Sequence, residues 1–148
     1  MSSELRFDVL VLGGGGAALR AALSACEQGA KTAILSKGEA GKSGATYYSV
    51  AEVGAFNVPD GALDPEDSPE EFYRDMEMAA LGTAQLPLCR ILAEQAESAL
   101  QYLEKISGGT VFAKEDGHFK VYQACFSTRP RSHVVENHFK PILRALRE

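Results

Sequence analysis

The spacing of apolar residues predicts two strands joined by a helix near the start of the chain. Residues 8–12 and 32–35 form apolar runs typical of buried parallel strands. Between them, apolar side chains recur at helical spacing until Gly29, which suits a helix end. This stripe consists of Leu19, Ala22, Leu23 and Cys26, where Cys26 is expected to pack as a small hydrophobe. The order of the three elements predicts a βαβ unit.

From residue 57 onward the pattern changes to a loop followed by helices. Pro, Gly and Asp dominate residues 57–69, which predicts a long surface loop. Ser68 then suits a helix N-cap that accepts a hydrogen bond from the amide of Glu71, and Glu71 is placed to reach back to Ser68. The buried face of this helix, as far as Gly82, is predicted to comprise Phe72, Met76, Ala79 and Ala80.

A second helix is predicted over residues 85–105, ending before Gly108 and Gly109. Its predicted buried side comprises Leu88, Leu92, Ala96, Ala99 and Leu103. Residues 110–112 and 119–122 flank Asp116-Gly117, a pair typical of a hairpin turn. A last helix is predicted over residues 141–146.

The turn after the first strand carries the most specific chemistry. Its sequence, Gly13-Gly14-Gly15-Gly16-Ala17-Ala18, fits the G-x-G-x-x-G/A pattern of dinucleotide-binding sites. Gly13 permits a tight turn off the strand, and Gly15 leaves the backbone open where a phosphate approaches. The amides and the dipole of the following helix then face the anion. The alternative, a glycine turn that binds no nucleotide, is disfavoured by the strand before it and the helix after it.

The end of the second strand helps to distinguish between cofactors. NAD and FAD sites usually place an acidic residue here to bind the ribose, whereas this chain has Ser36-Lys37. Ser36 can still hydrogen-bond a ribose hydroxyl, with less charge assistance than a carboxylate. Lys37 has two interpretations, contact with a phosphate or a solvated lysine. The missing acid disfavours an NAD-dependent Rossmann protein.

Together these segments resemble the flavoprotein family of fumarate reductase and succinate dehydrogenase, to which L-aspartate oxidase also belongs. The resemblance rests on residues 11–22, 34–37 and 43–48 and continues through 67–75, 103–104 and 129–131. It implies FAD, with its ADP half on the glycine turn and Ser36-Lys37, and its flavin end beside the Ser/Thr loop that follows. The cofactor-binding residues implied are Gly13, Gly14, Gly15, Gly16, Ala17, Ala18, Ser36, Lys37, Ser43, Gly44, Ala45, Thr46 and Ala51.

Two departures from the family pattern change what the resemblance implies. The stretch from Ser43 to Thr46 lacks the His that tethers the flavin in some members, which predicts non-covalent FAD as in L-aspartate oxidase. Val50-Ala51-Glu52 replaces the usual Gln-Gly-Gly beside the flavin ring. Glu52 brings a carboxylate toward that region, which weakens the expectation of the usual fumarate and succinate chemistry.

The predicted fold class is α/β, with a Rossmann-like βαβ FAD-binding unit over residues 1–56 and the start of an α+β capping domain over residues 57–148. Members of the family are much longer, and their catalytic His, Thr and Arg lie in later segments. We therefore expect a fragment that is inactive alone, and we assign no catalytic residue. Because two parallel strands leave open edges, we also expect self-association or a partner polypeptide that supplies the missing domain.

Composition narrows the class of protein. A net charge of −5 disfavours nucleic-acid binding, which needs a basic patch. The sequence shows no signal-peptide pattern and no apolar run as long as a membrane span, so no direct membrane insertion is expected. Three widely spaced cysteines fit reduced thiols in a cytoplasmic protein.

The segment from Arg129 to His138 gathers cationic and titratable groups, namely Arg129, Arg131, His133 and His138. Arginine suits recognition of carboxylates or phosphates, but a surface loop that pairs with local acids is the favoured interpretation. His118, beside the predicted turn, is expected to be solvated. The histidines and cysteines show no metal-ligand spacing, so no metal site is predicted.

The complete protein is expected to transfer hydride to or from a small organic acid through the flavin. The alternative is a nucleotide-binding module, or one part of a split protein, with no catalysis of its own.

Overall fold

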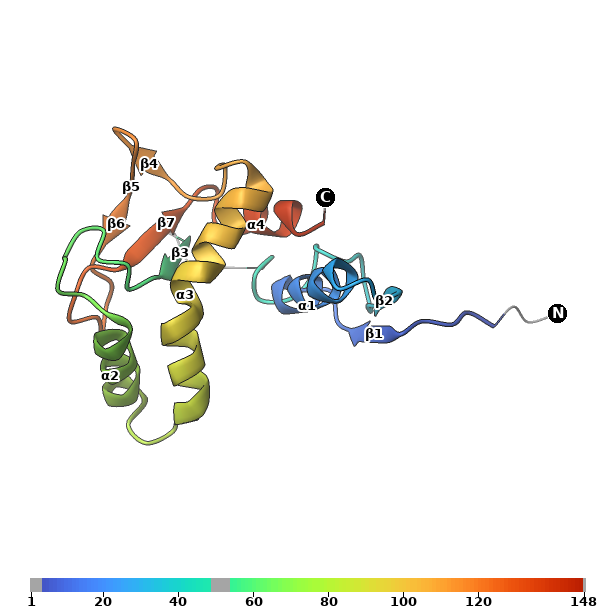
Figure 1. The fold of residues 1–148 in the computed structure, drawn as a ribbon, viewed down its shortest axis with the longest axis horizontal. Coiled ribbons are helices and arrows are strands. Elements are labelled where there is room, and N and C mark those ends of the chain that lie inside the picture. Colours follow the sequence, from blue (N-terminus) through green and yellow to red (C-terminus); the bar gives the residue numbers. More distant parts are fainter. Residues whose placement is uncertain (1–3, 49–53, 148) are drawn as a thin grey trace. The chain divides into compact units, whose positions relative to one another are not determined.

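The start of the chain forms the predicted βαβ unit in the computed structural model, which describes residues 4–48 and 54–147 (Figure 1). Strand β1 (Val9–Leu12) pairs in parallel with β2 (Thr32–Leu35), with Val9 opposite Thr32 and Leu12 opposite Leu35. Helix α1 (Gly16–Glu27) packs against both strands. It ends as predicted, where the Gly29 amide donates to the carbonyl of Cys26 at 2.9 Å.

The two strands are less buried than their apolar sequences predict. Leu10, Leu12 and Leu35 lie on one face of the sheet and are 59%, 72% and 61% exposed. An apolar sequence allows a strand to be buried, but burial also requires another element packed on each face of the sheet. Helix α1 covers only the face opposite to Leu10, Leu12 and Leu35, so these side chains stay exposed. Cys26 is exposed as well, whereas Leu19 and Ala22 on the same helix are buried, so the predicted packing of Cys26 was wrong.

The predicted C-terminal helix is present as α4 (Lys140–Ala145) and packs against α1. Ile142, Leu143 and Leu146 are buried, which gives this part of the chain its apolar core together with Leu19 and Ala22.

A small antiparallel sheet organises the middle of the chain. It contains β3 (Gly54–Asn57), β7 (Ser132–Val135) and β6 (Val121–Tyr122), in the order β3-β7-β6. The predicted hairpin forms around Asp116-Gly117, but it joins β4 (Lys114–Glu115) to β5 (His118–Phe119). The predicted strand at 110–112 instead lies beside β7, through a bridge between Phe112 and Val135.

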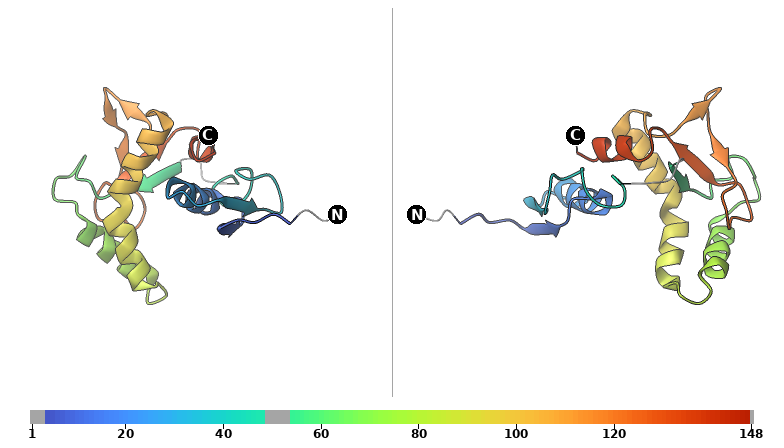
Figure 2. Two further views of the ribbon diagram at one scale, coloured as in Figure 1. Left: turned by 45° about the vertical axis from the view of Figure 1, so that its right-hand side comes forward. Right: turned by 180° about the vertical axis from the view of Figure 1, so that it is seen from behind.

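Two helices pack side by side in the same part of the chain, α2 (Pro69–Ala80) and α3 (Leu86–Ser107) (Figure 2). The predicted N-cap of α2 is confirmed, because the Ser68 hydroxyl accepts a hydrogen bond from the Glu71 amide at 3.3 Å. The Glu71 carboxylate accepts instead from the Arg74 guanidinium at 2.8 Å, so the predicted return contact is not made. Gly108 ends α3 in the left-handed conformation, as predicted.

The buried faces of both helices differ from the predicted ones. On α3, Leu88 and Leu92 are 59% and 53% exposed, and Ala99 is exposed too. Its buried residues are Ala93, Ala96, Leu100 and Leu103. On α2 the buried residues are Phe72 and Asp75, while Met76 is half-buried and Ala79 exposed.

The chain divides into two compact units at places other than the predicted boundary. The first contains Met1–Ala51 and Phe139–Glu148, and the second Glu52–His138. Strand β3 belongs to the second unit because it pairs along its length with β7. Helix α4 belongs to the first unit rather than to the segment predicted as a capping domain. The functional division into a cofactor part and a capping part stays a prediction.

Within the described residues, no helix combines the length and the apolar character needed to cross a membrane.

Candidate functional site

The glycine turn between β1 and α1 has the geometry of a phosphate-binding loop. Gly13 takes a φ of +128°, which is rarely accessible to other residues, and its amide donates to the carbonyl of Leu35 at 2.9 Å. The chain thus turns sharply off β1 while staying bonded to the end of β2. The carbonyl of Gly14 then accepts from the Gly41 amide at 2.7 Å, which ties the turn to the loop after β2.

Small groups from that loop approach the turn so closely that Gly14 and Gly16 have no room for a side chain. A Cβ at Gly14 would overlap the hydroxyl of Ser36 and lie 2.8 Å from that of Ser43. A Cβ at Gly16 would lie 2.9 Å from the hydroxyl of Thr46. At Gly15 a Cβ would meet only ordinary contacts, the nearest being the Ser43 carbonyl at 3.4 Å.

The same turn presents the uncapped start of a helix. Gly15 is the N-cap of α1, its backbone is extended, and no side chain caps the helix. No acidic residue lies in the first turn of α1. The first amides of a helix lack intrahelical partners and carry the positive end of its dipole, so this end favours an anion.

The structure brings most of the predicted site residues together. The cluster contains Gly13, Gly14, Gly15, Gly16, Ala17, Ala18, Ser36, Ser43, Gly44 and Thr46, which we call the glycine cradle. Lys37 and Ala45 are exposed on its flanks. Ala51 lies outside the described residues, as do Val50 and Glu52.

The cradle fits the diphosphate of a dinucleotide. Its glycines leave the backbone bare, the helix start supplies amide donors, and the hydroxyls of Ser36, Ser43 and Thr46 surround them. This combination of donors without a neighbouring acid in the helix turn suits phosphate oxygens.

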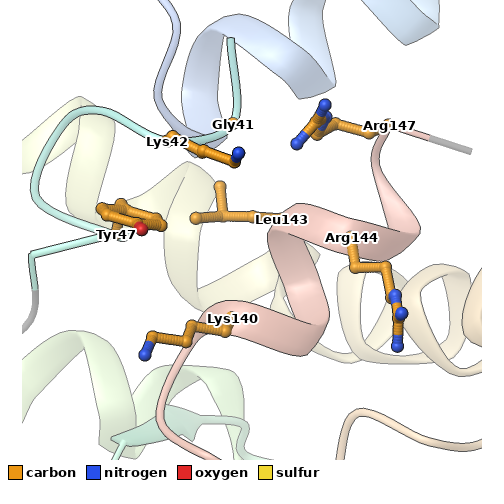
Figure 3. Close-up of a pocket in the computed structure, with 7 residues that line it drawn as sticks. All are labelled: Gly41, Lys42, Tyr47, Lys140, Leu143, Arg144 and Arg147. Atoms are coloured by element: carbon orange, nitrogen blue, oxygen red, sulfur yellow. The ribbon is translucent and has the colours of Figure 1, made fainter. Parts of the chain in front are cut away.

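A pocket beside the cradle was not predicted from the sequence. It has a volume of about 420 Å³ and lies between the loop after β2 and α4 (Figure 3). Its lining comprises Gly41, Lys42, Tyr47, Lys140, Leu143, Arg144 and Arg147. The available signal was the concentration of cations in the last residues of an acidic chain, but the loop that completes the pocket lies about a hundred positions earlier.

Of the four cationic and titratable groups around β7, Arg131 and His133 are buried, Arg129 is partly exposed and His138 is exposed. The predicted pairing with acids is confirmed for Arg129, Arg131 and His133. The Arg131 guanidinium, 1% exposed, donates to both oxygens of Asp67 at 2.7–3.1 Å and to Asp75 at 2.5 Å. Arg129 pairs with Asp64 at 2.6 Å and with Glu66 at 3.2 Å. The surface-loop interpretation was wrong for Arg131 and His133, whose acidic partners lie in or before α2, far from β7 in the sequence.

His133 is also buried, at 0% exposure. Its Nε2 lies 3.0 Å from a carboxylate oxygen of Asp60, and its Nδ1 lies 3.1 Å from the carbonyl of Arg131. Burial raises the pKa of Asp60, but contact with His133 and a backbone amide outweighs burial and holds that pKa below 3.8. His118 is exposed, as predicted. These histidines are therefore structural or solvated.

Comparison with known proteins agrees with a dinucleotide site in the glycine cradle. Residues 8–141 match a family described as FAD binding domain. The chain belongs to this family. It is 40% identical over 118 residues to one of the subunits of the fumarate reductase (CoM/CoB) of Methanothermobacter marburgensis, a match covering 78% of this chain and 20% of that protein. The predicted resemblance and the family's cofactor, FAD, are thereby confirmed.

Solved structures confirm the predicted α/β fold class. Mycobacterium smegmatis Sdh1 in complex with UQ1 matches with a TM-score of 0.81 and 27% identity, over 95% of this chain and 23% of that one. The open conformation of a flavocytochrome c3 fumarate reductase matches with a TM-score of 0.78 and 25% identity, over 95% and 24% of the two chains. The chain thus spans about a fifth to a quarter of the length of these relatives.

Proposed function

We propose that the glycine cradle holds the ADP half of a non-covalent FAD, and that the complete protein transfers hydride to or from a small organic acid. The observation that carries the proposal is the junction of β1 and α1. Positions without side chains there meet the hydroxyls of Ser36, Ser43 and Thr46 at an uncapped helix start.

Each part of the cradle has a role in this proposal. The α1 amides after Gly15 bind the diphosphate, and Ser36 at the end of β2 binds the ribose. Lys37, exposed beside it, is placed to approach a phosphate from solvent. Ser43, Gly44, Ala45 and Thr46 face the ribityl and flavin end, with Ala51 following them. When bound, FAD supplies the hydride chemistry, while these residues fix its position.

A second candidate function is that of a binding module without catalysis. It is favoured by the pairing of Arg129, Arg131 and His133, the groups best suited to recognising an organic acid in this segment. All three pair with acidic side chains of the second unit. In this case a second copy or another polypeptide completes the site.

We also propose a cytoplasmic location. Cys26, Cys89 and Cys125 are all free thiols, which supports a reducing compartment.

Gly15→Ala tests the cradle. The new methyl group fits beside the Ser43 carbonyl and the backbone angles at Gly15 suit any residue, so stability should fall by less than about 1 kcal/mol. The methyl group occupies the space where the diphosphate meets the backbone, so the affinity for FAD and ADP should fall at least about tenfold. Titration calorimetry and thermal unfolding measure the two quantities.

Gly38→Ala is the matched control, because a Cβ there meets nothing within 4 Å and the residue lies outside the cradle. It should change neither affinity nor stability. Equal affinities of Gly15→Ala and the wild type for both ligands would show that the diphosphate does not bind in the cradle.

The mode of attachment is tested by acid precipitation. Because the loop from Ser43 to Thr46 carries no His, a chain extended to the length of its relatives should release all its flavin on acidification. Absorbance of the supernatant and the pellet measures the distribution. A yellow pellet that survives washing would contradict non-covalent binding.

A further inference from the structure

The pocket beside the cradle has an unusual concentration of positive charge. Four of its seven lining residues are cationic, Lys42, Lys140, Arg144 and Arg147, in a chain whose net charge is −5. Lys42 comes from the loop after β2 and Arg147 from the end of the chain, whereas Lys140 and Arg144 come from α4. A concave surface lined by one sign of charge concentrates ions of the opposite sign.

Two of these cations are held in place. The aliphatic part of Arg147 lies over Gly41 so closely that a Cβ there would overlap it, and Gly41 has a φ of +79°. The Arg147 guanidinium lies 3.2 Å from one oxygen of Glu39, and the Lys42 ammonium lies 3.0 Å from the other. Lys42 and Arg147 together thus already bind both oxygens of the Glu39 carboxylate.

Besides the four cationic residues, the lining consists of the uncharged residues Gly41, Tyr47 and Leu143. Leu143 is 2% exposed, and Figure 3 shows it between the Tyr47 ring and the Lys42 and Arg147 side chains. Tyr47 also packs edge-on against Tyr48, with ring centroids 4.9 Å apart, which orients the ring. The pocket therefore combines two positioned cations with an aromatic ring, while Leu143 is almost fully buried and offers a ligand little surface.

We propose that this pocket binds a small organic phosphate, separately from the glycine cradle. Lys42 and Arg147 bind the phosphate oxygens in place of the Glu39 carboxylate, and the organic part packs against the ring of Tyr47. A phosphate carries more charge than the single carboxylate of Glu39, so it forms stronger charge-assisted hydrogen bonds with the same two cations. Lys140 and Arg144 on α4 add to the positive potential without belonging to the cradle.

The experiment is a calorimetric titration of the whole chain with phenyl phosphate at low salt, with inorganic phosphate as a second probe. Phenyl phosphate should bind more tightly, because its ring adds contact with the ring of Tyr47. The double variant Lys140→Gln/Arg144→Gln should weaken binding roughly fivefold, since each exposed charge contributes a fraction of a kcal/mol. Lys31→Gln removes an exposed cation that does not line the pocket and should have no effect.

Glu39→Gln distinguishes a ligand site from a structural ion pair. Removing the internal carboxylate frees Lys42 and Arg147, so the affinity for phenyl phosphate should rise, whereas a merely structural role predicts no gain. The proposal is overturned if neither probe binds, if both bind equally, or if Lys140→Gln/Arg144→Gln binds like the wild type. It is also overturned if Gly15→Ala abolishes binding, because the anion then occupies the cradle.

Discussion

Arg131→Met should lower the free energy of unfolding by about 3–5 kcal/mol, because it leaves two buried carboxylates without their counter-charge. Asp67 and Asp75 are 8% and 5% exposed, and both bond the Arg131 guanidinium. The free energy of unfolding of an ordinary domain is only about 5–15 kcal/mol, so this loss would remove a large part of it. Urea unfolding followed by circular dichroism measures the loss.

Arg129→Met is the matched control, because Arg129 lies two residues before Arg131 in the segment that leads into β7. Its ion pairs with Asp64 and Glu66 are partly exposed, so its loss should cost no more than about 1 kcal/mol. The triple variant Arg131→Met/Asp67→Leu/Asp75→Leu should regain part of the lost stability, because no unpaired charge remains but the Thr128 amide and hydroxyl lose their acceptor. Equal losses for the two arginine variants would contradict the buried-charge explanation.

The pH dependence of stability gives an independent measure of the same network. Burial raises the pKa of Asp75, but hydrogen bonds from Thr128 and the charge of Arg131 outweigh burial and hold the pKa below 3.8. A carboxylate with a lowered folded pKa contributes stability above its ordinary pKa and loses it as the pH falls through the lowered value. The stability contributed by Asp75 should therefore be present above its ordinary pKa of 3.8 and disappear as the pH falls through the lowered pKa of the folded state, and the triple variant should not show that loss.

The elements that local sequence determines were predictable. The strand, glycine turn, helix and second strand each depend on residues within a few positions, and all four form where the apolar spacing placed them. The same holds for the Ser68 cap and for the turn at Asp116-Gly117, since each depends on contacts within a short segment.

Burial was not predictable to the same degree, because it depends on distant partners. Alanine and leucine occur on more than one side of α3, so helical spacing alone left two candidate faces. The charge of Asp75 suggests an exposed position on α2, yet its side chain is buried, because it pairs with the guanidinium of Arg131. That partner lies 56 residues later in the chain, so local sequence does not reveal it. Without that partner, the pattern of apolar residues predicted Met76 instead.

The candidate site also contains a part that local sequence predicts and a part that it does not. The glycine cradle was predictable because its turn, its helix start and Ser36 follow one another in a short βαβ segment. The adjoining pocket was not, since Lys42 and Arg147 come together only when α4 packs on α1. A sequence motif identifies a site that one supersecondary unit builds, and it misses a site that two distant segments share.

The 148-residue chain should show no fumarate-dependent oxidation of reduced viologen above a protein-free control. Hydride transfer needs the acceptor carbon held against the flavin, and a misplacement of about 1 Å can cost on the order of a hundredfold. The chain offers a cradle for the ADP half, but its buried arginine, Arg131, already binds Asp67 and Asp75 through all of its guanidinium nitrogens.

The decisive comparison is with a chain extended to the length of the relatives, assayed with bound FAD. The extended chain should turn over fumarate or another small organic acid, and Gly15→Ala in the extended chain should reduce turnover by lowering cofactor occupancy. Saturating FAD should then restore part of that activity, which distinguishes a binding defect from a defect in chemistry. Comparable turnover by the short chain would show that this segment contains its own substrate site, and would place catalysis among the residues described here.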